Sequence, residues 1–390
     1  MALLGAHRRQ AAPEGPQVQD RAAPAGIAGD RILSDSSVAL GIGIIGAGFG
    51  AKVHLPAFSA VPGARVRMLA DGGSGRATSV RQAGLQAVSD WRRVIEAADI
   101  DLVVVAVPPD RHAAITLAAL EAGKHVLVEK PFGADAAQAQ AMAEARSRSG
   151  TVGAVGFQFR FEPHLRALSA AVKAGRIGAV RRVELSWQSA GRADPATPWS
   201  WQNDREAGGG VVNAFASHAL DLVQWLAGAP IAAVGRAERQ IVIAHRPHGN
   251  GRRAVTAEDR VGAELALEHG ITAGLDICNC RRDGDGMRIT VHGESGTLTS
   301  HQRPPFRPQD AQVILEPGGA LPIPLPAGWP EGDSRLGAAI GLSCALVAAI
   351  TGDGTPDYPD FNAGQSVRRV LDTLLAAPCA GPDHGGMDRV

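Results

Sequence analysis

Lysine is scarce in this chain, although basic residues are common. Four of its 39 basic side chains are lysine, and one of them, Lys130, follows an apolar, strand-like run at residues 126–128. A lysine ammonium can release its proton near neutral pH when burial or a nearby positive charge lowers its pKa, whereas an arginine cannot. Lys130 is therefore a candidate for proton transfer. The alternative is that it remains by chance in a sequence that favours arginine.

A glycine-rich hexapeptide at 46–51 indicates a dinucleotide site. GAGFGA follows the apolar run 38–45 and precedes residues 52–60, which can form a helix. Gly46 permits a tight turn, Gly48 lets the backbone approach a pyrophosphate, and the N-terminus of the helix offers free N–H donors. Strand, glycine turn and helix thus occur in the order that such a site requires.

A carboxylate after the next strand-like run bears on the choice of dinucleotide. Asp71 ends the run 65–70. At this position a carboxylate could accept hydrogen bonds from an adenosine ribose and repel a 2′-phosphate. Arg76 and Arg81 follow closely and could instead hold a phosphate. The sequence therefore favours NAD and leaves NADP open.

Strand-like and helix-like segments alternate between residues 38 and 128, as in a doubly wound parallel sheet. After the second strand they are a helix at 90–98, a strand at 102–107, a helix at 113–122 and a strand at 125–128, and a helix at 134–149 follows. Ligands of such sheets bind beyond the carboxyl ends of the strands. Lys130 comes directly after the last of these strands, so we expect it at the ligand-binding edge.

The composition predicts a soluble enzyme of two or three domains. The chain has 390 residues, 45% of them hydrophobic and 20% charged, and its 39 acidic residues cancel its 39 basic ones. This balance argues against nucleic-acid and membrane partners. Four cysteines are too few for a disulfide scaffold, which predicts a reduced, cytoplasmic setting. Cys278 with Cys280, and His245 with His248, lack metal-ligand spacing, so we expect no metal site.

Both ends of the chain are predicted to lie outside the fold. Residues 1–37 are rich in Ala, Gly, Pro, Arg and Asp without apolar periodicity, which indicates a disordered extension or an upstream start codon. We expect a flexible tail at 380–390. The pair at 8–9, Arg-Arg, is not followed by an apolar segment, which argues against export. The apolar run 339–350 is too short to span a bilayer and predicts a buried helix.

Seven motifs occur in an order that resembles the Gfo/Idh/MocA oxidoreductases. They are GAGFGA at 46–51, AVPPDRH at 106–112, LEAGKHVLVEKPFG at 120–133, GFQFRFEP at 156–163, GGGVVNAFASHALDLVQWLAG at 208–228, VHGESGTLTS at 291–300 and FNAGQSVRRVLDTLLAA at 361–377. The resemblance covers nearly everything from 40 to 377. It implies an α/β Rossmann domain at 38–155, with a doubly wound parallel sheet, and an α+β substrate and oligomerisation domain at 156–379.

The second domain is expected to carry a large, mainly antiparallel open sheet. Strand-like runs at 180–189, 232–244, 260–268, 271–279 and 287–292 support this independently, because turns rather than helices separate most of them. A chain that is first βαβ and then strand after strand indicates two domains of different class, with the nicotinamide in the cleft between them.

The family's catalytic set comprises the EKP lysine and an aspartate four residues before a histidine. Lys130 and His218 match the lysine and the histidine, whereas Ala214 stands at the aspartate's position. Asn213 is about 100° away round an α-helix. Asp221 could hydrogen-bond His218, although a structural or exposed aspartate is the more common case.

The resemblance implies that His218 is the acid/base and that Lys130 orients the substrate oxygen or relays its proton. An imidazole suits both directions of alcohol oxidation, since its pKa lies near neutrality. Without the aspartate, either another group holds the imidazole or Lys130 takes the main acid/base role. The alternative for His218 by itself is a core histidine with satisfied hydrogen bonds.

Other contacts are also expected. The predicted cofactor-binding residues are Gly46, Gly48, Phe49, Gly50, Asp71, Pro108, His112, Glu129, Lys130 and Gln158, and the predicted substrate-binding residues are Arg160, Trp201 and His218. A surface salt bridge is the alternative for Arg160, and filling of the domain boundary is the alternative for Trp201. His54 is as well suited to packing as to catalysis.

The function that these features predict is NAD(P)-dependent hydride transfer between nicotinamide and a secondary alcohol or ketone of a sugar, nucleotide-sugar or inositol-like polyol. Two alternatives stay open. One is an NAD-dependent glycosidase that oxidises the sugar transiently, and the other is a non-catalytic dinucleotide-binding sensor. An open sheet indicates a homodimer or homotetramer.

Overall fold

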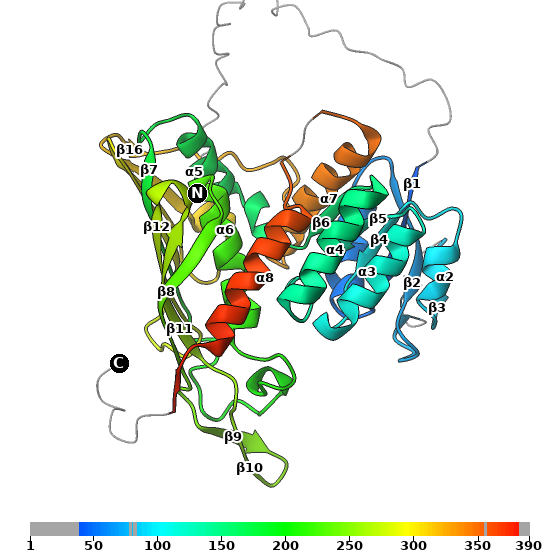
Figure 1. Cartoon of the computed structure of the whole chain (residues 1–390), viewed down its shortest axis with the longest axis horizontal. Helices are drawn as coiled ribbons and strands as arrows, with labels where there is room; N and C mark the ends of the chain where they lie inside the picture. The colour runs from blue at the N-terminus through cyan, green and yellow to red at the C-terminus, as the bar shows by residue number, and fades with distance from the viewer. Residues whose placement is uncertain (1–38, 78–79, 81–83, 355–356, 382–390) are drawn as a thin grey trace, which may run out of the picture. The chain divides into compact units, whose positions relative to one another are not determined.

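The computed structural model describes residues 39–77, 80, 84–354 and 357–381. The predicted N-terminal extension and most of the predicted C-terminal tail lie outside these residues. Within the described part of the chain, no helix combines the length and the apolar character that a membrane span needs. The described residues from 39 onward belong to one compact unit, and it contains two large β-sheets (Figure 1).

The first sheet is parallel and six-stranded, in the order β3-β2-β1-β4-β5-β6. Its strands are β1 (Leu40–Ile45), β2 (Ala64–Ala70), β3 (Gln86–Val88), β4 (Leu102–Val105), β5 (His125–Val128) and β6 (Gly153–Val155). β1, β4 and β5 are apolar runs buried on both faces, as strands between two helix layers must be. The predicted doubly wound sheet is thereby confirmed. Strand order reverses between β1 and β4, where such sheets bind ligands.

Two strands of this sheet were not predicted. β3 and β6 have three residues each, too few to give a hydrophobic pattern. As a result Lys130 follows the penultimate strand along the chain, not the last one. β6 lies beside β5 and extends the sheet past the lysine.

The helices around the first sheet begin near the expected positions. They are the π-helical turn η1 (Gly50–His54), α1 (Leu55–Ser59), α2 (Arg92–Glu96), the 3-10 turn η3 (Pro109–Arg111), α3 (His112–Glu121) and α4 (Ala136–Ser149). The segment predicted as one helix at 52–60 is thus a π-turn followed by a short α-helix. Capping residues set both ends of α4. At its N-terminus Asp135 accepts a hydrogen bond from the Gln138 backbone N–H at 2.8 Å, and at its C-terminus Gly150 ends the helix with a φ of 67°.

The second sheet has nine strands, in the order β16-β15-β14-β13-β7-β12-β11-β8-β17. They are β7 (Val180–Gln188), β8 (Ile231–Gln240), β11 (Arg260–Leu267), β12 (Thr272–Cys278), β13 (Gly286–Gly293), β14 (Thr297–Gln302), β15 (Gln312–Glu316), β16 (Gly319–Ala320) and β17 (Cys379–Ala380). Two pairs, β7 with β12 and β8 with β17, are parallel and the others are antiparallel. The prediction of a large, mainly antiparallel sheet is confirmed, and Ala380 of the predicted tail pairs at its edge.

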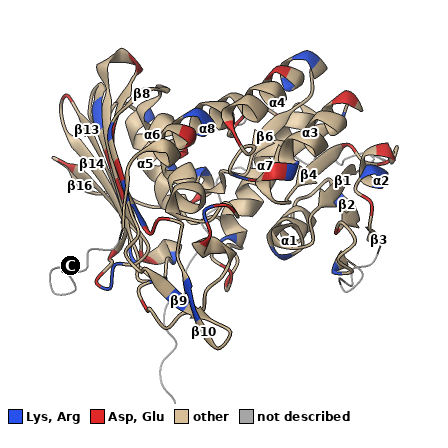
Figure 2. Cartoon of the chain, turned by 60° about the horizontal axis from the view of Figure 1, so that its bottom comes forward, with Lys and Arg blue, Asp and Glu red and all other residues tan. Residues whose placement is uncertain are grey.

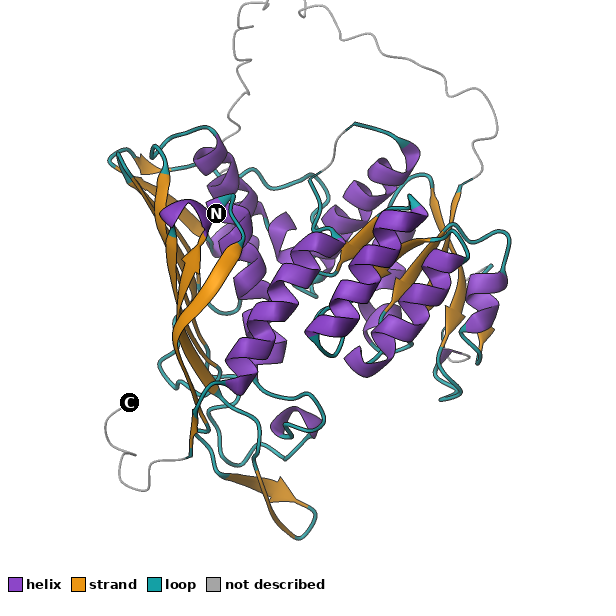
Figure 3. Cartoon of the chain, viewed as in Figure 1, coloured by secondary structure: helices purple, strands orange, loops and turns teal. Residues whose placement is uncertain are grey.

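Helices cover one face of this sheet (Figure 3). The helical elements in the rest of the chain are η4 (Gln158–Phe161), α5 (Pro163–Lys173), η5 (Trp201–Asn203), the π-helical turn η6 (Val212–Ala216), α6 (Ser217–Ala227), η7 (Glu268–Gly270), η8 (Pro308–Asp310), α7 (Leu336–Thr351) and α8 (Phe361–Ala376). Of these, α7 packs on α1 and β1 of the first sheet. In the second sheet, β11 shows the pattern that one covered face requires, because Val261, Ala263 and Leu265 are buried while Glu264 between them is exposed. Burial of Val261 and of Leu265 each stabilises the fold by roughly 1.5–3 kcal/mol.

Two elements differ from their predicted form. The apolar run 339–350 is a helix as predicted, but α7 buries only one side, with Ala338, Leu342 and Leu346 at 0–1% exposure. The segment with His245 and His248 is not a simple turn. It forms β9 (His245–His248), which pairs with β10 (Gly251–Ala254) in a hairpin.

Two buried ionisable side chains lie at the start of α5, and both have unpaired polar atoms. Glu162 Oε2 and both ring nitrogens of His164 are buried without a hydrogen-bond partner. Burial raises the pKa of Glu162 to about 8 and lowers the pKa of His164 to about 4. Each side chain is therefore neutral in the folded protein near pH 7.

The Glu162→Gln variant should lose a pH dependence that the parent chain has. The pKa of Glu162 is higher in the folded chain than its unfolded value of 4.5. Its contribution to the free energy of unfolding is therefore complete below pH 4.5 and is lost as pH rises to about 8. The slope is about 1.4 kcal/mol per pH unit. His164 has the opposite sign and loses stability as pH falls from 6.5 to about 4. The two slopes cancel between pH 4.5 and 6.5.

Urea unfolding at pH 6.5, 7 and 8 tests this. The free energy of unfolding of Glu162→Gln should exceed that of the parent by an amount that grows with pH across this range. The exposed Glu268 provides the control, since Glu268→Gln should leave the pH dependence as it is. A constant difference between Glu162→Gln and the parent would contradict the assignment.

Candidate active site

Lys130 lies at the carboxyl edge of the parallel sheet, where the sequence placed it. The strand before it, β5, is buried, and the Lys130–Pro131 peptide bond is cis. The Lys130 ammonium donates a hydrogen bond to the Ala214 carbonyl oxygen at 3.2 Å, so it extends from the first sheet to the helix that carries His218. Burial lowers the pKa of Lys130, and the adjacent Glu129 carboxylate opposes that shift.

A buried hydrogen bond connects the lysine segment to the glycine turn. Glu129 Oε1 lies 2.8 Å from His54 Nε2, and its other oxygen accepts from the Lys130 backbone N–H at 3.2 Å. A Cβ at Gly156 would lie 2.6 Å from this carboxylate, so glycine is required there. These contacts favour the packing alternative for His54. Both carboxylate oxygens of Glu129 are engaged in these hydrogen bonds. Its predicted contact with the cofactor stays a prediction.

His218 follows a π-turn that the sequence analysis did not anticipate. In a π-turn, hydrogen bonds join residues five apart. The displacement expected for Asn213 was calculated for an α-helix, whereas η6 is a π-turn, so that displacement stays a prediction. The Asn213 amide donates to the Gly208 carbonyl oxygen at 3.2 Å. Ala214 provides the carbonyl that holds Lys130 and no carboxylate.

Aromatic rings surround His218. Its imidazole stacks on Phe159 with ring centroids 4.3 Å apart and an interplanar angle of 11°, and the Phe157 ring meets it edge-on at 6.0 Å. His218 Nδ1 is buried without a hydrogen-bond partner. Burial and the positive charge of Lys130 together hold the pKa of His218 well below its usual value. His218 is thus a neutral, desolvated imidazole beside a buried lysine, not a core histidine with satisfied hydrogen bonds.

Arg160 and Asp221 form a buried ion pair. Arg160 donates from Nε at 2.9 Å and from Nη2 at 2.6 Å to the two carboxylate oxygens of Asp221, and the two residues are 7% and 1% exposed. Asp221 is therefore structural, and it is bonded to Arg160 in place of His218. This pairing favours the salt-bridge alternative for Arg160, although the bridge is buried and not at the surface. Its contact with substrate stays a prediction.

The glycine turn has the shape that a pyrophosphate needs. Gly46 has a φ of 121°, and a Cβ there would lie 2.1 Å from the Ala106 carbonyl oxygen, so the turn requires glycine. A Cβ at Gly50 would lie 2.7 Å from Ile44, which shows how closely η1 packs on β1. Gly48 is exposed, with open space where its Cβ would be. These residues fit a bound dinucleotide.

Asp71 is engaged by its own loop. Its carboxylate accepts hydrogen bonds from the backbone N–H groups of Gly73 at 2.9 Å and Ala77 at 2.8 Å. The bond from Ala77 is the largest cause of its lowered pKa. Asp71 is therefore ionised and partly exposed, as a ribose acceptor must be. Arg76 lies in the same loop, and Arg81 lies outside the described residues.

Four other predicted cofactor contacts differ in their exposure. Phe49 is half-buried and Pro108 is exposed, so both are accessible. Gln158 is 5% exposed, and its Oε1 atom is buried without a partner. His112 is fully buried, and its ring nitrogens lie 2.8 and 3.1 Å from two main-chain carbonyl oxygens. These contacts favour a structural role for His112.

Trp201 is the most exposed large hydrophobic side chain among the described residues, at 60%. It lies in η5, beside the β9–β10 hairpin. Trp199, two residues earlier, is fixed to that hairpin, because its Nε1 donates to the Ala254 carbonyl oxygen at 3.1 Å and Arg253 lies 3.6 Å above its ring. Trp201 is thus held on an anchored loop with its own ring free, and its contact with substrate stays a prediction.

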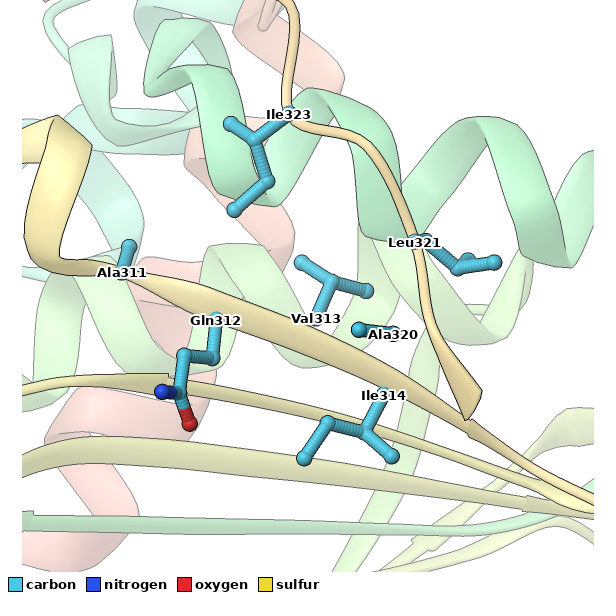
Figure 4. A pocket seen from close by; sticks show the side chains of 7 residues that line it. All are labelled: Ala311, Gln312, Val313, Ile314, Ala320, Leu321 and Ile323. Atoms are coloured by element: carbon cyan, nitrogen blue, oxygen red, sulfur yellow. The ribbon is translucent and has the colours of Figure 1, made fainter. Parts of the chain in front are cut away.

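Two other features lie apart from these residues. A cavity of about 390 Å³ lies at the edge of the second sheet (Figure 4), and it is lined by Ala311, Gln312, Val313, Ile314, Ala320, Leu321 and Ile323. None of the candidate catalytic or cofactor residues lines it. Lysine, arginine and acidic side chains are interspersed over the chain (Figure 2). Among the described residues no cluster of three potential metal ligands occurs.

Sequence patterns did not predict the aromatic surroundings of His218 or the two ion pairs that brace the site. The second of these joins Glu258 to Arg239 at 3.2 Å, and Glu258 also accepts from the Val212 backbone N–H at 3.1 Å at the start of η6. A Cβ at Gly210 would lie 2.2 Å from this carboxylate. The one available signal was the motif GFQFRF, in which three aromatic residues alternate with polar ones.

Comparisons with known proteins agree with this arrangement. Residues 40–157 match the family described as "Oxidoreductase family, NAD-binding Rossmann fold", and residues 165–299 match the "GFO/IDH/MocA C-terminal domain". Levoglucosan dehydrogenase from Pseudarthrobacter phenanthrenivorans is 32% identical over 285 residues, which cover 66% of this chain and 73% of that protein. Inositol 2-dehydrogenase from Rhizobium meliloti is 31% identical over 266 residues, which cover 67% and 76%.

A solved structure of levoglucosan dehydrogenase, in complex with NADH and L-sorbose, is also similar. It has a TM-score of 0.76 and 25% sequence identity, and the match covers 87% of this chain and 96% of that one. Both sequence motifs and fold therefore lead to the same group of proteins. This chain belongs to the Gfo/Idh/MocA family of oxidoreductases, with that family's NAD-binding Rossmann fold in its first half.

Proposed function

We propose that this protein is an NAD-dependent dehydrogenase of a sugar or inositol-like polyol, with Lys130 and His218 as its proton-transferring residues. One observation carries the proposal. The Lys130 ammonium reaches from the first sheet to the Ala214 carbonyl oxygen, four residues before His218, and its positive charge acts on the buried His218 imidazole. The relatives named for levoglucosan and inositol support the substrate class.

The glycine turn at Gly46 and Gly48 would hold the pyrophosphate, and Asp71 the ribose. Bound NAD⁺ supplies the ring that accepts the substrate's hydride. Lys130 donates a hydrogen bond to the reacting oxygen and stabilises the negative charge that develops there. His218, kept neutral because burial and Lys130 lower its pKa, accepts the hydroxyl proton. Since Ala214 supplies no carboxylate, Lys130 takes a larger share of the proton transfer.

Dinucleotide titration followed by a substrate screen tests the function. NAD should bind more tightly than NADP, because the Asp71 carboxylate repels a 2′-phosphate. Levoglucosan, myo-inositol and related polyols are then supplied with NAD⁺, and NADH is followed by its absorbance. Appearance of NADH with one of these substrates supports the proposal. Cleavage of aryl glycosides without net NADH would support an NAD-dependent glycosidase instead. Binding without any turnover would support a sensor.

The Ala214→Asp variant should move the pH profile. A carboxylate at this position, next to the carbonyl that holds Lys130, favours the charged forms of both buried bases and raises the pKa of each. The acid limb of kcat/KM should therefore shift to higher pH by about one unit. Ala214→Asn is the control of equal size and should leave the limb in place. Equal shifts in both variants would indicate a steric effect and contradict this prediction.

We also propose that the protein is a cytoplasmic homodimer or homotetramer and that its domain boundary lies near residues 155 and 156. β6 ends at Val155, and the aromatic segment of η4 begins three residues later. The face of the nine-stranded sheet that the helices leave open carries ion pairs such as Arg182 with Glu264 at 3.0 Å. Light scattering of the purified chain measures the assembly.

A further inference from the structure

No hydrogen bond at Nδ1 fixes the orientation of the His218 ring. Its Nδ1 atom is buried and has no hydrogen-bond partner. A ligand or catalytic imidazole usually donates its second N–H to a carboxylate or carbonyl, which fixes its orientation. In this chain the ring instead stacks in parallel on Phe159, with centroids 4.3 Å apart and an interplanar angle of 11°.

Phe159 also contacts a second aromatic ring. Its ring lies 5.6 Å from that of Trp187 on β7, and the Trp187 ring in turn meets Phe215 of η6 edge-on at 4.6 Å. Aromatic residues make up only 4% of the chain, so this grouping does not reflect a general abundance. Phe159 thus packs against rings contributed by different elements of the fold.

The Arg160–Asp221 pair joins the two segments that carry the stacked rings. Arg160 is the residue after Phe159, and Asp221 lies three residues after His218, about one turn along α6. The bidentate bridge at 2.9 and 2.6 Å therefore joins η4 to α6 directly beside the stack. Because both partners are buried, water does not compete for these hydrogen bonds.

We propose that Phe159, braced by Arg160 and Asp221, is a positioning residue that orients His218 by aromatic stacking. The inference rests on the proposed function, in which His218 exchanges a proton with substrate. The stack restricts rotation of the imidazole and keeps water from one of its faces. It leaves the ring nitrogens free to alternate between donor and acceptor, which a reversible proton transfer requires.

Replacement of Phe159 tests the proposal. Phe159→Leu should lower kcat by about 10- to 100-fold, the size of effect expected when a reacting group is displaced by a fraction of an ångström to 1 Å. The dissociation constant for NADH should not change, because Phe159 is assigned no cofactor contact. Phe159→Tyr keeps the ring and should restore most of the activity. Phe161→Leu is the matched control, since that ring lies in the same η4 turn but packs against Arg166 and the Gly341 position of α7.

A second measurement does not depend on turnover. Titration of the His218 imidazole by NMR should give a higher pKa in Phe159→Leu than in the parent, because water then reaches the ring and reduces the desolvation that lowers it. Phe159→Tyr should titrate like the parent.

The outcomes separate this inference from the proposed function. If the parent turns over no polyol but the Phe159→Leu titration shifts as described, the stack is correct and the function is wrong. If the parent is active and Phe159→Leu leaves both kcat and the His218 titration unchanged, the positioning role is refuted. Equal losses in Phe159→Leu and Phe161→Leu would refute it too, since they would indicate general packing.

Discussion

Lys130→Met is expected to lower kcat by roughly 10³-fold, the size of effect typical of a lost acid–base group. Methionine keeps the length of the side chain but has no proton to exchange and no charge to stabilise the reacting oxygen. The variant should fold and bind NADH, because the one hydrogen bond that the structure gives the ammonium is to the Ala214 carbonyl oxygen. Single-turnover rates of NADH formation measure the loss directly.

Lys124 offers a matched control for this experiment. Its ammonium also donates to backbone carbonyl oxygens, those of Ala97 at 3.0 Å and Ile100 at 2.8 Å, but on the far end of the same sheet. Lys124→Met should lower stability by about 1 kcal/mol through these lost bonds and leave kcat unchanged. If Lys130→Met kept kcat near that of Lys124→Met, proton transfer could not depend on Lys130.

His218→Asn is expected to lower kcat by roughly 10²- to 10⁴-fold. Asparagine fits the space but cannot accept a proton. Since burial and Lys130 lower the pKa of His218, the parent should stay active well below pH 6.5, until the imidazole is protonated. His218→Asn should lack that acid limb. The rate of NADH formation between pH 4.5 and 8 measures both effects, and His292→Gln, on the open face of the second sheet, serves as the control.

The double variant shows whether Lys130 and His218 act in the same step of the reaction. If Lys130 and His218 act as one relay, Lys130→Met with His218→Asn should be hardly slower than the slower single variant. If they act on different steps, the two losses should multiply. If His218→Asn still loses activity at low pH, protonation of Lys130 would be the cause of that loss. The roles proposed for the two residues would then be reversed.

The sequence by itself determined the elements whose signals are local. The apolar run 125–128 predicted β5 with its observed bounds, and the glycine turn required a φ that Gly46 adopts. Lys130 was placed at the carboxyl edge because parallel strands of a doubly wound sheet end together. Three-residue strands such as β6 were missed, since so short a run has no period to detect.

Only the tertiary structure decided how the candidate catalytic residues are held. The π-turn at η6 was not predicted, because a shift of one backbone hydrogen bond leaves no mark on side-chain periodicity. Arg160 meets Asp221 across 61 residues, and Lys130 meets Ala214 across 84. A local pattern contains no information about partners so distant, since the fold alone brings them together. The sequence thus identified which groups could do the chemistry, and packing determined what orients them.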